Sequence, residues 1–462
     1  MVKITIAGAA GGEVTGSSYI VETENAKVMV DAGMFQGGKA AEEKNRLPED
    51  VDLQSIKALL LTHAHLDHTG RVPLALKNGY RNAIYATPAT IDLTEIVLLD
   101  AAKIQEQDAN RKNRDHPQMH AEPLYTPEDV AVFRSQCKQV LLHQPIPVAE
   151  GITAQFHEAG HILGSASIEL TVEEKGTKKT IVFSGDLGPH ELPLLRPFDQ
   201  LPFADLVFME STYGDRNHRS LYETLQEFEQ IIQNSVDQKG KILIPAFAIG
   251  RTQQILYHLA ILFFLKKIPP FPVFVDSPMA IEAGKVFTKY PDLFDEEAIE
   301  WKRQGVFPLD KSLFKFTTSV EESKQLNDLK GPCAIIAGSG MCTAGRIQHH
   351  LKFNLPVRTT NVVIAGYQSN GSLGRHLVDG DRQVKIHGET VDVRASIHTL
   401  NGLSAHAGQS DLLTWFSSLS KGKPKVCLTH GENPQREALA SAIEKNFGLK
   451  PSLPELGDVV QL

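Results

Sequence analysis

The sequence contains few cysteines and no close pair of them. The four are scattered along 462 residues, at Cys137, Cys333, Cys342 and Cys427. This spacing resembles neither a zinc knuckle nor a redox motif, and buried, apolar thiols are the expected state of each. The N-terminus, MVKITIAGAAGG, also lacks the charged start, long apolar stretch and cleavage site of a signal peptide. Both absences predict a protein of the reducing cytoplasm.

Long apolar runs, internal repeats and low-complexity segments are missing as well. Even the most apolar stretch, LYHLAILFFLKKIPPF, is interrupted by two lysines and by prolines, so we expect no membrane-spanning helix. Apolar residues make up 42% of the chain and charged residues 22%, which is typical of globular proteins. A chain of this length is too long for one core and predicts two or three domains.

The charge balance excludes little. A net charge of −8 argues mildly against a surface coated by nucleic acid. The 47 lysines and arginines can still cluster in space. Carboxylates gathered at a metal centre would also lower the total without repelling an anionic substrate, because bound cations offset them.

What the sequence does contain is a series of short apolar runs rich in valine and isoleucine. They include VKITIAG, YIVETE, KVMVDAG, KALLLTHA, AIYAT, KTIVFSGD and ADLVFME. They predict strands whose carboxyl ends present polar side chains. Apolar residues at helical spacing predict helices at 88–113, 127–139, 221–238 and 250–265, and Thr-Pro pairs open the first two. The pattern predicts an α/β domain, interrupted by a second α/β domain and resumed near the C-terminus.

The segment HAHLDH carries the clearest chemical signal. His63, His65, Asp67 and His68 directly follow the predicted strand KALLLT. Residues two apart on an extended segment point the same way, so His63 and His65 can bind one ion together. Asp67 and His68, past the bend, can face a second ion. Imidazole and carboxylate suit zinc and its neighbours.

A site for two ions needs more ligands, and candidates again follow predicted strands. They are His161 in EAGHILGSAS, Asp186 in IVFSGDLG and His430 in VCLTHGE. Asp186 is the natural bridging carboxylate, because one anion between two cations relieves their repulsion. Asp31 also ends a strand and is expected to orient a ligand histidine. Read alone, each of these residues could equally be an ordinary loop residue.

Taken together, HAHLDH, AGHILGSA and FSGD resemble the metallo-β-lactamase superfamily in order and spacing. The inserted segment is similar to the β-CASP branch, nucleases that include the pre-mRNA cleavage endonuclease and its bacterial and archaeal relatives. Further matching motifs are MESTYGDR, IPAFAIGRTQ, DSPMA, GSGMCTAGR, LSAHAG and LTHGE. The resemblance covers essentially the whole chain. It implies an αββα metallo-β-lactamase sandwich formed by residues 1–208 and 375–462, with an inserted α/β β-CASP domain at 209–374.

The resemblance also implies roles for single residues. One zinc ion would be held by His63, His65, His161 and Asp186, and the other by Asp67, His68, Asp186 and His430. A hydroxide between the ions would attack phosphorus. Asp67, Glu210 and His406 are the expected catalytic residues: His406 would protonate the leaving oxygen, and Glu210 would orient it. Ser339 and Arg346 in GSGMCTAGR, together with Arg251, are candidate phosphate contacts, although a structural turn and a surface residue are equally ordinary readings.

Within the family, the histidine of LTHGE is typical of the branches that act on RNA, where DNA-repair branches carry valine. GSGM also departs from the GSQGEP-like run of the exonucleolytic bacterial branch. We therefore expect a zinc-dependent endonuclease for single-stranded RNA, with loose sequence choice because no RNA-binding appendage follows LTHGE. A 5′-3′ exoribonuclease, a DNA nuclease and a small-molecule hydrolase of the same fold are the alternatives. A homodimer is expected from similar proteins.

Overall fold

The chain folds into two compact units. A computed structural model describes residues 1–37, 41, 43–46, 52–118, 120–306, 313–366, 368–369 and 371–462. Unit 1 comprises Met1–His190, Pro197–Asn217 and His406–Leu462, and unit 2 comprises Glu191–Arg196 and His218–Ala405. Each unit has its own sheets and its own buried apolar clusters.

Unit 1 contains two sheets. The first is seven-stranded, in the order β21-β1-β2-β3-β4-β5-β6. Its strands are β1 Lys3–Ile6, β2 Tyr19–Glu22, β3 Lys27–Val30, β4 Ile56–Leu60, β5 Ala83–Ala86, β6 Cys137–Gln139 and β21 Val459–Gln461. The second is six-stranded, in the order β20-β11-β10-β9-β8-β7. Its strands are β7 Ile146–Ala149, β8 Ile152–Glu158, β9 Ala166–Glu174, β10 Thr177–Phe183, β11 Leu206–Glu210 and β20 Lys425–Thr429.

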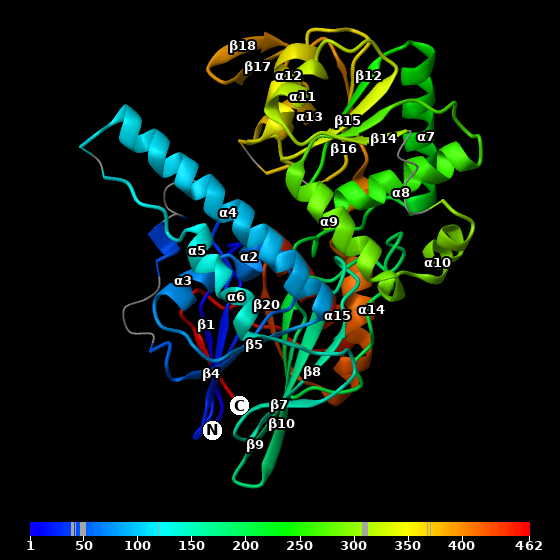
Figure 1. Ribbon diagram of the computed structural model, residues 1–462. Coiled ribbons are helices and arrows are strands. Elements are labelled where there is room, and N and C mark those ends of the chain that lie inside the picture. The colour runs from blue at the N-terminus through cyan, green and yellow to red at the C-terminus, as the bar shows by residue number, and fades with distance from the viewer. Residues whose placement is uncertain are drawn as a thin grey trace. The chain divides into compact units, whose positions relative to one another are not determined.

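The two sheets pack face to face because alternate strand residues are apolar. Ile4 and Ile6 of β1 share one buried cluster with Ala154 and Phe156 of β8. Helices cover both outer faces: α3–α6 cover the first sheet, while α14 and α15 cover the second (Figure 1). The helices are α2 Leu66–Thr69, α3 Val72–Lys77, α4 Pro88–Asp115, α5 Pro127–Ala131, α6 Phe133–Gln136, α14 Gln409–Leu419, α15 Asn433–Phe447 and the short η3 Ser420–Gly422. The expected αββα sandwich is therefore confirmed.

Most predicted helices of the chain are present, with one correction. Thr87 caps α4 by accepting a hydrogen bond from the Thr90 backbone at 3.2 Å, as the Thr-Pro signal predicted. The predicted helix at 127–139 is wrong beyond residue 136, because Cys137–Gln139 forms β6 beside β5 in a parallel pair. The tertiary pairing overrides the helical spacing of that segment.

Unit 2 is built on a six-stranded parallel sheet in the order β14-β13-β15-β12-β16-β19. Its strands are β12 Lys241–Pro245, β13 Val273–Val275, β14 Phe314–Phe316, β15 Cys333–Ala337, β16 Asn361–Ile364 and β19 Ser396–Thr399, with β17 Gln383–Ile386 and β18 Glu389–Asp392 as a separate hairpin. Its helices are α7 Leu221–Asp237, α8 Arg251–Phe264, α9 Pro278–Lys289, α10 Glu296–Arg303, α11 Val320–Gln325, α12 Arg346–Asn354 and α13 Leu373–Val378, with η1 Pro291–Leu293 and η2 Asn401–Leu403. Buried clusters on both faces make it a three-layer α/β unit.

The chain returns from unit 2 to unit 1 after Ala405. The strand β19 pairs in parallel with β16, so the chain stays in unit 2 through Ala405. The domain ranges expected from the resemblance themselves stay a prediction.

All four cysteines are free thiols, three of them buried and Cys137 half-buried. Among the described residues, no helix combines the length and apolarity that crossing a membrane requires.

Candidate metal centre

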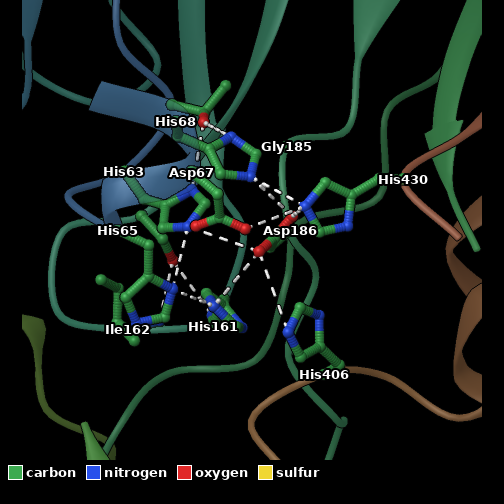
Figure 2. Close-up of polar contacts among 12 residues, drawn as sticks. His63, His65, Asp67, His68, His161, Ile162, Gly185, Asp186, His406 and His430 are labelled. Carbon is green, nitrogen blue, oxygen red and sulfur yellow. Dashed lines mark hydrogen bonds and ion pairs between the residues drawn. The ribbon is translucent and has the colours of Figure 1, made fainter. Parts of the chain in front are cut away.

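The candidate ligands gather in unit 1 because they follow strands that end at neighbouring positions. Asp31 follows β3 and His63 comes soon after β4, and these two strands are parallel. In the second sheet, β10, β11 and β20 are also mutually parallel, and they deliver Asp186, Glu210 and His430. The loop after β8 supplies His161. The structure thus brings together all seven predicted metal ligands (Figure 2).

The first donor group consists of His63, His65, His161 and Asp186. His65 Nδ1 lies 3.2 Å from His63 Nε2 and 3.1 Å from His161 Nε2. Asp186 Oδ2 lies 3.4 Å from His63 Nε2 and 3.5 Å from His161 Nε2.

The second donor group consists of Asp67, His68 and His430, joined by the other oxygen of Asp186. His68 Nε2 lies 3.1 Å from His430 Nε2 and 3.2 Å from Asp186 Oδ1. His430 Nε2 lies 3.5 Å from Asp186 Oδ1 and 3.5 Å from Asp67 Oδ2.

These separations fit two cations that share one carboxylate. Ligand atoms around a tetrahedral zinc ion lie about 3.3–3.6 Å apart, given bonds of about 2.0–2.2 Å. Within both groups the separations are 3.1–3.5 Å. Asp186 Oδ2 belongs to the first group and Oδ1 to the second. The residues present therefore fit a two-ion centre bridged by Asp186.

The histidines of the first group are set up as neutral ligands. Burial and the neighbouring His63 lower the pKa of His65 to about 3. Burial likewise lowers the pKa of His63, aided by His68, and lowers that of His161 well below its usual range, aided by His406. Neutral imidazoles offer the lone pairs that a metal binds.

In the second group, buried carboxylates favour positive charge on the histidines. Burial opposes the charged form of His68, but Asp186 and Asp31 outweigh it and raise the pKa of His68 well above its usual range. His430 behaves in the same way: burial opposes its charge, and Asp186 together with Asp67 raises its pKa. Buried carboxylates that hold protons on nearby imidazoles would also stabilise a divalent cation in their place.

Hydrogen bonds orient the second group. Asp31, at a backbone φ of +58°, accepts a hydrogen bond from His68 Nδ1 at 2.7 Å and one from the Thr62 hydroxyl at 2.8 Å. This leaves His68 Nε2 directed toward His430 and Asp186 (Figure 2). The Thr212 hydroxyl lies 3.2 Å from His430 Nδ1 in the same way. Asp31 was predicted from the sequence, whereas the roles of Thr62 and Thr212 were not. Thr62 directly precedes HAHLDH, and Thr212 stands two residues after Glu210.

His406 lies beside the bridging carboxylate. Its Nδ1 is 3.3 Å from Glu210 Oε1, and its Nε2 is 3.9 Å from Asp186 Oδ2. Glu210 is buried and also accepts a hydrogen bond from the Leu187 backbone at 2.7 Å. Burial opposes the charge of His406, but Glu210 and Asp186 outweigh it and raise its pKa to about 9. The imidazole thus favours its protonated form and has Nε2 facing the donor groups.

The three predicted phosphate contacts belong to unit 2. Arg251 opens α8 with only 5% of its surface exposed, and it donates to Gln254 Oε1 at 2.7 Å. The Ser339 hydroxyl accepts backbone hydrogen bonds from Thr343 and Ala344, at 3.0 and 3.2 Å. Ser339 therefore organises its own turn.

Arg346 is bound inside unit 2 as well. Its guanidinium donates to Asp276 Oδ1 at 2.7 Å and to the Thr318 carbonyl at 2.8 Å. Asp276 is fully buried and also accepts from His350, Thr317 and Ser323. These contacts show how Arg346 holds the GSGM segment to its neighbours, and its role as a phosphate contact stays a prediction.

Comparison with known proteins agrees with the architecture. The Metallo-beta-lactamase superfamily model matches residues 11–93, the Beta-Casp domain model matches 252–377, and the model of the Zn-dependent metallo-hydrolase RNA specificity domain matches 390–454. Ribonuclease TTHA0252 of Thermus thermophilus is 40% identical over 460 residues, covering 98% of each chain. Transcription termination factor FttA of Pyrococcus abyssi is 29% identical, over 99% of this chain and 71% of its own.

A solved structure supports the fold alone. It is a protein of unknown function from Enterococcus faecalis V583, 13% identical, covering all of both chains with a TM-score of 0.56.

The fold and the clustered imidazoles and carboxylates define a metal-dependent hydrolase. Within that class, the chain belongs to the β-CASP branch of the metallo-β-lactamase superfamily.

Proposed function

We propose that this protein is a zinc-dependent ribonuclease that cuts single-stranded RNA endonucleolytically. The observation that carries the proposal is Asp186, whose two oxygens each lie within 3.2–3.5 Å of imidazole nitrogens from a different donor group. A shared carboxylate of this kind suits two metal ions, and two-metal sites are common in nucleases and phosphatases. The names of the related ribonuclease and termination factor support RNA as the substrate.

The two zinc ions would be held by the groups described above, with His63, His65 and His161 on one and Asp67, His68 and His430 on the other. When bound, two such cations supply an activated water at neutral pH and neutralise charge that develops on the phosphate. Asp67 takes part as a catalytic residue through this ligand position.

The leaving oxygen of a phosphodiester must be protonated as its bond to phosphorus breaks. His406 suits this step because Nδ1 is engaged by Glu210 at 3.3 Å, which leaves the proton on Nε2 available. Glu210 holds the ring in one orientation and stabilises its charged form. Because it also accepts the Leu187 backbone N–H at 2.7 Å, Glu210 is itself fixed in place.

The test of this proposal is the product pattern on labelled RNA. Zinc-loaded protein would be given one unstructured RNA sequence in four forms: 5′-triphosphate, 5′-monophosphate, 5′-hydroxyl and covalently closed circle. We expect cleavage of all four at similar rates, because an endonuclease needs no free end. Cleavage only of linear RNA with a 5′-monophosphate would show a 5′-3′ exonuclease instead.

Two controls address the other activities. DNA of the same sequence should be cut far more slowly, and a panel of thioesters and lactams should be untouched. Hydrolysis of a thioester or lactam with intact RNA would overturn the ribonuclease proposal. Homodimer formation, a cytoplasmic location and substrate contacts by Ser339, Arg346 and Arg251 stay predictions.

A further inference from the structure

A second cluster of metal-ligand side chains lies in unit 1, apart from the residues of the candidate metal centre. His143, His157 and Asp199 each offer one ligand atom, and these atoms all lie within 4.8 Å of one another. The three residues come from separate parts of the chain. His143 precedes β7, His157 lies on β8, and Asp199 lies in the segment before β11.

The strand alternation of β8 places His157 on the outer face of its sheet. Ile152, Ala154 and Phe156 point into the core between the two sheets, so His157 points the other way. Glu169 of the neighbouring strand β9 is on the same face, diagonal to His157 in the antiparallel register. Its Oε2 lies 3.3 Å from His157 Nε2.

The Nε2 atom of His157 makes an ion-pair contact with Glu169 but no hydrogen bond with any described residue. The residue is only 8% exposed, and Nε2 is buried without a hydrogen-bond partner among the described residues, despite the nearby Glu169 carboxylate. A buried polar atom in this state is costly. His157 is therefore able to bind a further ligand beside His143 and Asp199.

The other two donors are fixed by the backbone. His143 holds a left-handed conformation at a φ of +63°, secured by its N–H donating to the Phe156 carbonyl at 2.8 Å. Asp199 and Glu158 exchange two hydrogen bonds: the Asp199 N–H donates to the Glu158 carbonyl at 2.8 Å, and Asp199 Oδ2 accepts from the Glu158 N–H at 2.7 Å. His143 Nε2 then lies 2.6 Å from the same Oδ2. Donors held in this way are preorganised for a common ligand.

We propose that His143, His157 and Asp199 form an additional zinc site. Two imidazoles and one carboxylate are a suitable donor set for zinc, and they leave the fourth position to water. A zinc ion there would link the segment before β7, the strand β8 and the segment before β11.

The proposal is tested by counting zinc in matched variants. His143→Asn removes the imidazole and keeps a residue that tolerates the left-handed backbone. His376→Asn is the control, since His376 is similarly exposed (53% against 58% of the side chain) and also pairs with an aspartate, Asp381, at 2.9 Å. Each protein would be stripped with a chelator, dialysed against micromolar zinc and analysed for metal per chain.

We expect His143→Asn to bind one zinc ion fewer per chain than the wild type, and His376→Asn to bind the same number. The difference of one does not depend on how many ions the candidate metal centre holds, and RNA cleavage by His143→Asn should match that of the wild type. Asp199→Asn provides a second variant, expected to weaken zinc binding at this one site tenfold or more. Equal zinc content and zinc affinity in all four proteins would overturn the proposal and leave His143 and Asp199 as a hydrogen-bonded pair only.

Discussion

Replacing His406 with alanine separates protonation of the leaving oxygen from metal binding. His406 Nε2 lies 3.9 Å from Asp186 Oδ2, farther than the 3.1–3.5 Å between neighbouring atoms of the two donor groups. Asp186, Glu210 and His406 also form a group that could hold an ion, so the metal content of the variant decides between a ligand and a proton donor. Under the proposed function His406 is the proton donor. We expect the variant to retain the metal content of the wild type.

The expected loss in rate depends on the leaving group. Removing a general acid costs about 10²–10⁴-fold in rate, which corresponds to about 2.7–5.5 kcal/mol of activation free energy. A ribose oxygen is a poor leaving group and should show this full loss. A p-nitrophenolate is stable as an anion and needs no proton, so a p-nitrophenyl phosphodiester should be cleaved at nearly the wild-type rate, within about tenfold.

The assay compares kcat on both substrates and metal per chain by elemental analysis, with His376→Ala as an exposed-histidine control. Equal losses on RNA and on the p-nitrophenyl ester would refute the assignment, because the role of His406 would then not concern the leaving oxygen. A fall in metal content would instead identify His406 as a ligand.

Three further predictions concern metal binding and stability. Asp186→Asn should abolish RNA cleavage and lower the metal content below that of the wild type, since both donor groups share Asp186; unchanged metal content would contradict the bridging geometry. Chelation should lower the Tm of the wild type, because an ion present at a hundredfold excess over its Kd stabilises the native state by about 2.7 kcal/mol, and a calorimetric scan that shows no shift would argue against tight binding. Asp276→Asn should destabilise unit 2 by about 3–5 kcal/mol at pH 7, because it breaks the buried pair with Arg346, while the exposed Asp328→Asn should change little. Burial opposes the charge of Asp276, but hydrogen bonds from His350 and its other donors lower its pKa. The stability that the charged carboxylate contributes is therefore complete above about pH 4, the pKa of an unfolded aspartate, and declines below it. The difference in stability between wild type and Asp276→Asn should thus narrow on acidification, and a difference that widens would contradict the prediction.

The sequence alone was enough to predict the candidate ligands that lie within one short segment. HAHLDH begins three residues after the end of β4, and the bend at the start of α2 divides its residues between the two donor groups. His161, Asp186 and Asp31 could be proposed because each follows a strand. Their convergence depends on which strands pair, and spacing alone carries no information about that.

The distant residues show this limit most clearly. Glu210 and His430 are neighbours because β11 and β20 pair in parallel across more than two hundred residues. The position of His430 after a predicted strand suggested it as a ligand, but only the family resemblance predicted the roles of Glu210 and His406. Burial was also not predictable from the sequence: Arg251 was expected as a phosphate contact or a surface residue, and only 5% of it is exposed. Its role as a phosphate contact stays a prediction.

The boundaries of unit 2 have a consequence for how this enzyme can diversify. The chain leaves unit 1 at Asn217 and re-enters at His406, and there the Asn217 side chain accepts a hydrogen bond from the Ser410 backbone at 2.8 Å. The points at which the chain leaves and re-enters unit 1 are thus joined by a hydrogen bond within unit 1. This hydrogen bond does not depend on the length of the segment inserted between the two points. We therefore expect an inserted unit of another size or surface to leave Glu210 and His406 in contact.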